Sequence, residues 1–172
     1  MSVDDTQSMK LAGRNLAIAS RMGAEQLVAP CSGCFLTLKK SQHRMKEYPE
    51  KGELVRRALD SVGLSLNGGP EVRHALDILM SDVGLDKIRQ KVTHPLKGLV
   101  VAPYYGCQIV RPYADFDDQQ NPVMMDNLFN ALGAKVCEYP LKTRCCGGHL
   151  TGKMDEPGKR LSFILLREAN GR

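Results

Sequence analysis

The chain has 172 residues, 42% of them hydrophobic, and a formal net charge of +5, which is enough for one packed domain or two very small ones. Its basic residues are scattered and it has no Trp, so the composition argues against a nucleic-acid-binding surface. No apolar run reaches the length of a membrane-spanning helix, and charged residues interrupt the N-terminal stretch where a signal peptide needs an apolar core. We therefore expect a cytoplasmic protein without a membrane span.

The first third of the chain predicts a helix, a strand and a second helix. Apolar residues at helical spacing predict a helix over 4–22 that ends at Gly23, and residues 26–30 predict a short buried strand. Cys31 and Cys34 then form a C-x-x-C at the start of a helix over 35–45, where the helix N-terminus favours thiolate. This pattern indicates either a dithiol redox motif or half of a metal site.

The middle of the chain, residues 50–97, predicts a helical connection without cysteine. We expect one helix ending near Gly63, a second with Pro70 in its first turn, and a third over 85–92. The second helix is suggested by the apolar residues Val72, Ala75, Leu76 and Leu79. The histidines of this region and its border are expected to be surface or packing residues rather than ligands: His43, His74 and His94.

The last part of the chain alternates strands and helices. We expect strands over 98–103 and 134–139, a loop over 108–121, and helices over 124–132 and 159–169. This alternation predicts an α/β fold with a mostly parallel sheet flanked by helices, and one compact unit overall. Cys137 falls inside a predicted strand and is interpreted as a packing residue.

A short internal repeat links the two halves of the sequence. The pattern Val-Ala-Pro-x-x-Gly-Cys ends at Cys34 and again at Cys107, each time directly after a predicted strand. Such a repeat indicates two related strand–loop units. Because open α/β sheets place their sites at the C-terminal ends of strands, we expect the cysteine loops to gather at one such edge.

The most unusual string is Cys145-Cys146-Gly147-Gly148-His149. Adjacent thiolates cannot point the same way, so they suit a site that needs ligands on two different metal atoms. The glycines permit close backbone approach and positive φ, and nearby cations are expected to lower the thiol pKa: Lys142, Arg144 and Lys153. Buried inert cysteines or a vicinal disulfide are the alternatives.

These residues resemble the cysteine-rich CCG domains of the B-type subunit of heterodisulfide reductase. Cys107, the spacer 108–144 and Cys145-Cys146-Gly147 match the opening of the family motif, and Cys31-Ser32-Gly33-Cys34 looks like its closing C-x-x-C. The resemblance covers nearly the whole chain. It implies a CCG-domain-like fold and an iron–sulfur oxidoreductase.

In that family the five cysteines of a motif hold a noncubane [4Fe-4S] cluster, and the subunit cleaves the heterodisulfide of coenzyme M and coenzyme B. The resemblance therefore implies a cluster-borne catalytic site, a thiol or disulfide substrate, and partner subunits that carry iron–sulfur clusters and flavin. The implied ligands, for cofactor and metal alike, are Cys31, Cys34, Cys107, Cys145 and Cys146, with Gly147, Gly148, Lys142, Arg144 and His149 in support.

The chain departs from the family in one respect, because it carries the end of one motif and the beginning of the next. We expect residues 1–49 to be the second half of a first CCG-like unit, 50–97 the helical connection, and 98–172 the first half of a second unit. Two plus three cysteines make the complement of one cluster in permuted order. The alternatives are a structural Zn²⁺ site, with His149 as a possible ligand, a fragment without cofactor, or a metal-free dithiol protein using Cys31 and Cys34.

Overall fold

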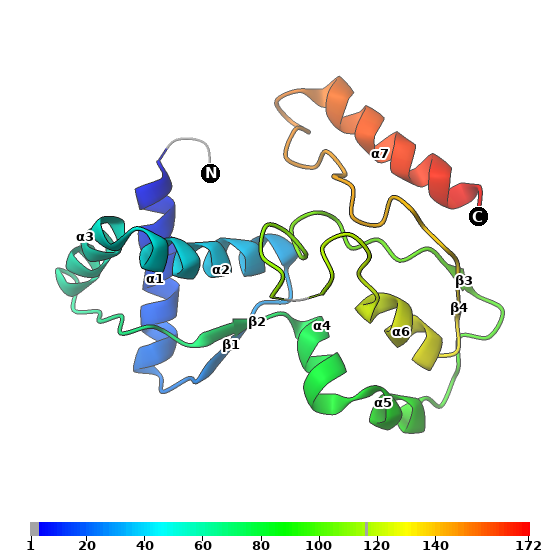
Figure 1. Cartoon of the computed structure of the whole chain (residues 1–172), viewed down its shortest axis with the longest axis horizontal. Helices are drawn as coiled ribbons and strands as arrows, with labels where there is room; N and C mark the ends of the chain where they lie inside the picture. Colours follow the sequence, from blue (N-terminus) through cyan, green and yellow to red (C-terminus); the bar gives the residue numbers. More distant parts are fainter. Residues whose placement is uncertain (1–3, 116) are drawn as a thin grey trace. The chain divides into compact units, whose positions relative to one another are not determined.

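A computed structural model of the chain describes residues 4–115 and 117–172. The chain divides into two compact units, Met1–Ala75 (unit 1) and Leu76–Arg172 (unit 2). The division lies inside the stretch predicted as a helical connection. Each unit combines helices with one short parallel strand pair, so the predicted α/β class is confirmed (Figure 1). None of the helices in the described residues combines the length and apolar character needed to cross a membrane.

Unit 1 is built from three helices and two strands, whose bounds are α1 Asp5–Arg21, β1 Gln26–Val28, α2 Ser32–Glu47, α3 Pro49–Asp60 and β2 Glu71–Arg73. Asp4 begins α1, where its carboxylate accepts a hydrogen bond of 2.8 Å from the Thr6 N–H. The helix packs against both α2 and α3. Met9, Leu16 and Val55 are at most 1% exposed, so these contacts form an apolar core within the unit.

The strand β2 corrects one sequence-based expectation. The helix expected to start at Pro70 does not form there, and Glu71–Arg73 instead pairs in parallel with β1, with Leu27 opposite Val72. Val72 is buried, and its β-branched side chain suits a strand. The preceding Gly69 has φ +73°, a conformation that bends the chain before the strand. The stretch 50–97 is therefore not a purely helical connection.

Unit 2 contains short helices, one strand pair and a long C-terminal helix. Its elements are α4 Ala75–Ile78, the π-helical turn η1 Leu79–Val83, α5 Leu85–Lys91, β3 Val100–Val101, α6 Met124–Ala131, β4 Lys135–Val136 and α7 Asp155–Asn170. The predicted helices 85–92, 124–132 and 159–169 coincide closely with α5, α6 and α7, so these three predictions are confirmed. The loop predicted over 108–121 includes Phe116, which lies outside the described residues.

The strands of unit 2 are shorter than predicted. Val100 lies opposite Lys135 and Val101 opposite Val136, and the ladder is extended by Cys137 N–H donating to the Val101 carbonyl at 2.9 Å. Beyond this point Pro103 has no N–H to donate, which ends the ladder. In the described residues the strands form two separate pairs. The expectation of one sheet across the chain is therefore wrong.

Candidate functional site

The loop that carries the double cysteine, residues 139–149 (the second cysteine loop), is fixed by a glycine against α7. Gly147 has φ +78°, and a Cβ at this position would lie 2.9 Å from the Gly158 carbonyl oxygen. Only glycine fits such a conformation and approach. Ser162 of α7 donates a hydrogen bond of 2.8 Å to the Cys146 carbonyl. The sequence predicts positive φ for Gly148 as well, but Gly148 is absent from the positive-φ glycines of the described residues.

The loop after β3, residues 104–107 (the first cysteine loop), lies directly against the second. The backbone N–H groups of Tyr105 and Gly106 both donate to the Lys142 carbonyl, at 2.8 and 2.9 Å. The Tyr104 hydroxyl donates to the Arg144 carbonyl at 2.6 Å. These bonds connect positions about forty residues apart in the chain, so the two cysteine loops form one local structure.

The two loops bring together Cys107, Cys145 and Cys146. Burial raises the pKa of Cys107, and the interaction with Cys145 raises it further. The pKa of the Tyr104 hydroxyl is also raised, by burial and then by Cys146, with smaller contributions from the other two thiols. Tyr104 and the three cysteines therefore belong to the same local structure. Cys145 and Cys146 are exposed and Cys107 is half-buried.

The polar residues around this group differ in their roles. The Lys142 ammonium lies 3.3 Å from Asp126 and donates to the Pro122 carbonyl at 2.6 Å, so it joins the second cysteine loop to α6. His149 Nε2 lies 2.6 Å from Gln108 Nε2 in a hydrogen bond that again joins the two loop regions. The Cys145 sulfur accepts a hydrogen bond of 3.4 Å from the Gly147 N–H.

The cysteine pair of unit 1 has a different environment. Cys31 is the N-cap residue of α2, and its pKa is lowered, first by the backbone N–H of Cys34, then by the Cys34 thiol and the Gly33 N–H. The pKa of Cys34 is raised, chiefly by its hydrogen bond with Cys31. Both side chains are exposed. The direction for Cys31 is the one expected of a thiol at a helix N-terminus, whereas the direction for Cys34 is the opposite.

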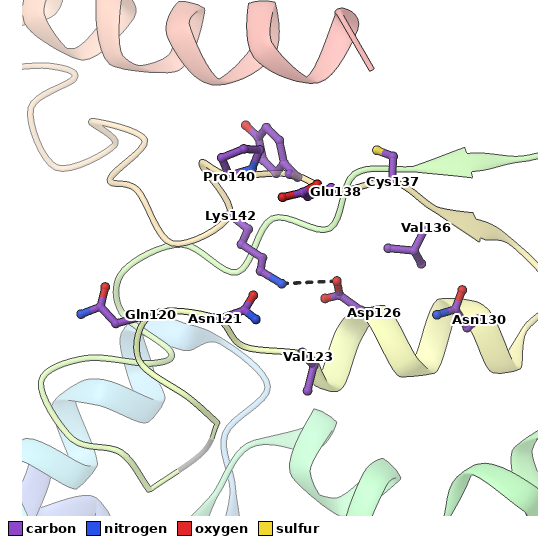
Figure 2. A pocket seen from close by; sticks show the side chains of 11 residues that line it. Gln120, Asn121, Val123, Asp126, Asn130, Val136, Cys137, Glu138, Pro140 and Lys142 are labelled. Atoms are coloured by element: carbon purple, nitrogen blue, oxygen red, sulfur yellow. Dashed lines mark hydrogen bonds and ion pairs between the residues drawn. The ribbon is translucent and has the colours of Figure 1, made fainter.

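A cavity of about 530 Å³ lies beside the second cysteine loop in unit 2. Figure 2 shows Lys142 reaching from the loop to Asp126 on α6, with Cys137 and Glu138 on the strand side. Cys137 is half-buried. Within residues 4–115 and 117–172, no group of three or more His, Cys, Asp or Glu side chains is arranged so that it could hold a metal ion.

Sequence reasoning did not identify Tyr105 and Asp126 as part of the site. Tyr105 is 5% exposed and donates a hydrogen bond of 2.5 Å to Asp126. The short repeat that ends at Cys107 includes the position of Tyr105 but says nothing about its partner. No local pattern marks Asp126, because its role depends on residues from three separate segments.

Comparison with known proteins shows which family shares these cysteine-containing segments. The model of the cysteine-rich domain (CCG) matches residues 1–39 and 101–169. The B-type subunit of the ferredoxin:CoB-CoM heterodisulfide reductase of Methanosarcina mazei is 34% identical over 169 residues, covering 95% of this chain and 56% of that protein. A heterodisulfide reductase-like protein of Archaeoglobus profundus, named for the same type of subunit, is 31% identical over 97% of this chain and 56% of its own length.

A third relative is named for another reaction. The 8-methylmenaquinol:fumarate reductase membrane anchor subunit of Wolinella succinogenes is 33% identical over 97% of this chain and 58% of its own length. The chain thus spans somewhat more than half the length of these curated relatives. The two matched segments contain Cys31 and Cys34 in one case and Cys107, Cys145 and Cys146 in the other. The chain therefore belongs to the cysteine-rich CCG domain family and is similar over nearly its whole length to the B-type subunit of heterodisulfide reductase.

Proposed function

We propose that this chain is an iron–sulfur oxidoreductase subunit, or a part of one, in which Cys107, Cys145 and Cys146 supply thiolates to a noncubane [4Fe-4S] cluster. The observation that carries the proposal is the set of hydrogen bonds that joins the loop of Cys107 to the loop of Cys145 and Cys146. All three lie in the segment 101–169 that the family model matches. Soft thiolates are the ligands that iron–sulfur clusters require.

The chemistry of the donor set fits such a cluster. Cys145 and Cys146 are adjacent, so their side chains leave the backbone in different directions and suit two different iron atoms. Gly147 allows the close approach of this loop to α7, which keeps the pair in a fixed backbone. The Gly147 N–H donates to the Cys145 sulfur, and hydrogen bonds to cluster sulfurs are one of the features that set the reduction potential. When bound, the cluster would supply one-electron chemistry.

Cys31 and Cys34 are proposed as further thiolate ligands. They lie in the other matched segment, 1–39, and α2 favours the thiolate form of Cys31. The hypothesis that all five thiolates serve one cluster stays a prediction. We propose a thiol or disulfide as substrate and partner subunits carrying iron–sulfur clusters and flavin as the source of electrons, in the cytoplasm. The relatives' names support the reductase class, although they differ in the substrate they mention.

The test is anaerobic reconstitution of the purified full chain with iron and sulfide, followed by iron and sulfide analysis and visible absorption. We expect a brown protein with close to equal iron and sulfide. The variant Cys146→Ser is expected to lose most of the bound iron, whereas the matched variant Cys137→Ser, which changes the half-buried cysteine outside the group, should retain it. Bound zinc without sulfide, or unchanged iron in Cys146→Ser, contradicts the proposal.

The shared-cluster hypothesis has its own readout. If one cluster uses thiolates from both matched segments, Cys34→Ser reduces iron content as strongly as Cys146→Ser. If Cys34→Ser leaves iron content unchanged, the cluster does not use the C-x-x-C. In that case the proposal is limited to Cys107, Cys145 and Cys146.

A further inference from the structure

The N-terminus of α6 is capped by a tyrosine from the first cysteine loop. The N-cap residue Val123 has no side-chain hydrogen bond to offer the helix. The Tyr105 hydroxyl instead accepts from the backbone N–H of Met125 at 2.7 Å and of Asp126 at 3.1 Å. These are donors that a helix leaves without an intrahelical partner. Tyr105 is therefore held by the helix backbone, two residues before Cys107.

The carboxylate of Asp126 completes this arrangement by binding both cysteine loops. Its Oδ2 accepts the hydrogen bond of 2.5 Å from the Tyr105 hydroxyl, and its Oδ1 lies 3.3 Å from the Lys142 ammonium. Lys142 belongs to the second cysteine loop, three residues before Cys145. One oxygen of Asp126 thus serves each loop, and Figure 2 shows the contact between Asp126 and Lys142.

The three side chains are well shielded from water. Tyr105 is 5% exposed, and the side chains of Lys142 and Asp126 are 12% and 20% exposed. The Lys142 ammonium also lies 5.6 Å from the centre of the Tyr105 ring. Removing the carboxylate would leave a largely buried ammonium without its counter-charge and a buried hydroxyl without its acceptor, and both losses are costly.

We propose that Asp126 is a positioning residue whose two carboxylate oxygens fix the spacing of Cys107 and Cys145 by holding Tyr105 and Lys142 together. The inference rests on the proposed function, because the spacing matters to a cluster that both thiolates bind. Asp126 acts on the thiols through Tyr105 and Lys142, which lie two and three residues before Cys107 and Cys145 in the chain.

The first test measures the spacing in the metal-free chain, without any cluster. Cys31, Cys34, Cys137 and Cys146 are replaced by Ser, and the rate of Cys107–Cys145 disulfide formation with a mild oxidant is followed by mass spectrometry. Asp126→Asn is expected to slow this reaction by about threefold or more, because loss of orientation lowers the effective concentration of the reacting groups. The matched control is Asp86→Asn, whose carboxylate binds Arg89 at 2.8 Å on the surface of α5.

The second test asks whether the effect passes through both partners. In the reconstituted chain, Tyr105→Phe and Lys142→Met should each speed the release of iron to a chelator, and Lys142→Arg should restore slow release because it keeps the charge and the donors. In the Tyr105→Phe, Lys142→Met double variant, adding Asp126→Asn should change the disulfide rate little, since its partners are already absent. A full additional effect would overturn the proposal.

Thermal unfolding separates positioning from stability alone. If Asp126→Asn lowers the unfolding temperature but leaves the disulfide rate equal to that of Asp86→Asn, the residue has only a structural role and the inference is wrong. Should Asp126→Asn not fold, Tyr105→Phe and Lys142→Met decide the question through the same rate. If the unsubstituted chain binds no iron, the proposed function fails, while the disulfide rates still judge the positioning role.

Discussion

The cysteines of the two units differ in how their thiols are held. In unit 1, Cys31 and Cys34 lie on one turn at the start of α2, both exposed, and backbone N–H groups lower the pKa of Cys31. In unit 2, Cys107 is half-buried between two loops, and burial raises its pKa. The pKa of a cysteine thiol is therefore lowered at the helix N-terminus in unit 1 and raised by burial in unit 2.

The two groups of cysteines also differ in whether local or non-local contacts bring their thiols together. The position of the two C-x-x-C thiols depends only on the helix that begins at Ser32. Formation of its first turn is therefore enough to bring them together. The group in unit 2 depends on hydrogen bonds between two loops, such as those that the Lys142 carbonyl accepts from Tyr105 and Gly106. Its thiols should therefore respond to changes in loop anchoring that leave the pair in unit 1 unaffected.

The largest expected effect tests whether unit 1 has a core of its own. Leu16 is 0% exposed, and Leu16→Ala is expected to lower the free energy of unfolding by about 3 kcal/mol, through lost apolar burial and a cavity. Leu11→Ala on the same helix, where Leu11 is 69% exposed, should change it by less than about 0.5 kcal/mol. Chemical denaturation followed by circular dichroism measures both. Equal effects would show that α1 is not packed as described.

The second effect concerns the anchoring of the second cysteine loop. Gly147→Ala is expected to cost about 2 to 3 kcal/mol, because it combines a left-handed backbone with a close contact to the Gly158 backbone. Gly152→Ala is the control, since Gly152 has φ +97° but nothing within 4 Å of an added Cβ. The difference between the two variants in denaturation isolates the contact. If they unfold alike, α7 does not constrain this loop.

Much of the local structure could be predicted from the sequence. The apolar spacing of α1 and the glycine that ends it, the start of α2 at the C-x-x-C, and the glycine that follows α6 are local signals. Cys107, its spacing from Cys145-Cys146-Gly147, and the C-x-x-C were enough to identify the family. The helix signals lie close together in the chain, and the family signal needs only residue types at fixed spacing.

The features that could not be predicted are non-local. The strand β2 has only three residues, too few for a periodic pattern, and it forms because β1 offers it a partner. The contact of Tyr105, Asp126 and Lys142 is also non-local, because the three residues come from three separate segments of the chain. The expectation of a single sheet was wrong because strands of two residues in β3 and β4 leave little ladder for other strands to join.

A smaller effect is expected where Tyr104 lies among the thiols of unit 2. Tyr104→Phe removes the hydroxyl that donates to the Arg144 carbonyl and should cost about 1 kcal/mol, the net contribution of an ordinary hydrogen bond. Tyr48→Phe in unit 1, on a 39% exposed ring, serves as the control. Chemical denaturation measures both variants, and an unchanged free energy of unfolding in Tyr104→Phe would contradict the hydrogen bond to Arg144.

The smallest expected effect tests the asymmetry of the pair in unit 1 through the pH dependence of alkylation. Thiolate is the reacting form, so the lowered pKa of Cys31 means that it is alkylated at lower pH than an ordinary cysteine, and the raised pKa of Cys34 means the reverse. In Cys31→Ser, the alkylation profile of Cys34 should move to lower pH, because its shift comes chiefly from Cys31. In Cys34→Ser, Cys31 should keep a lowered pKa, since the backbone N–H that contributes most is still present.

The test measures the alkylation rate of each cysteine against pH by mass spectrometry in the metal-free chain. A symmetrical response, in which each substitution shifts the other cysteine equally, would mean that the helix N–H groups do not hold the Cys31 thiolate.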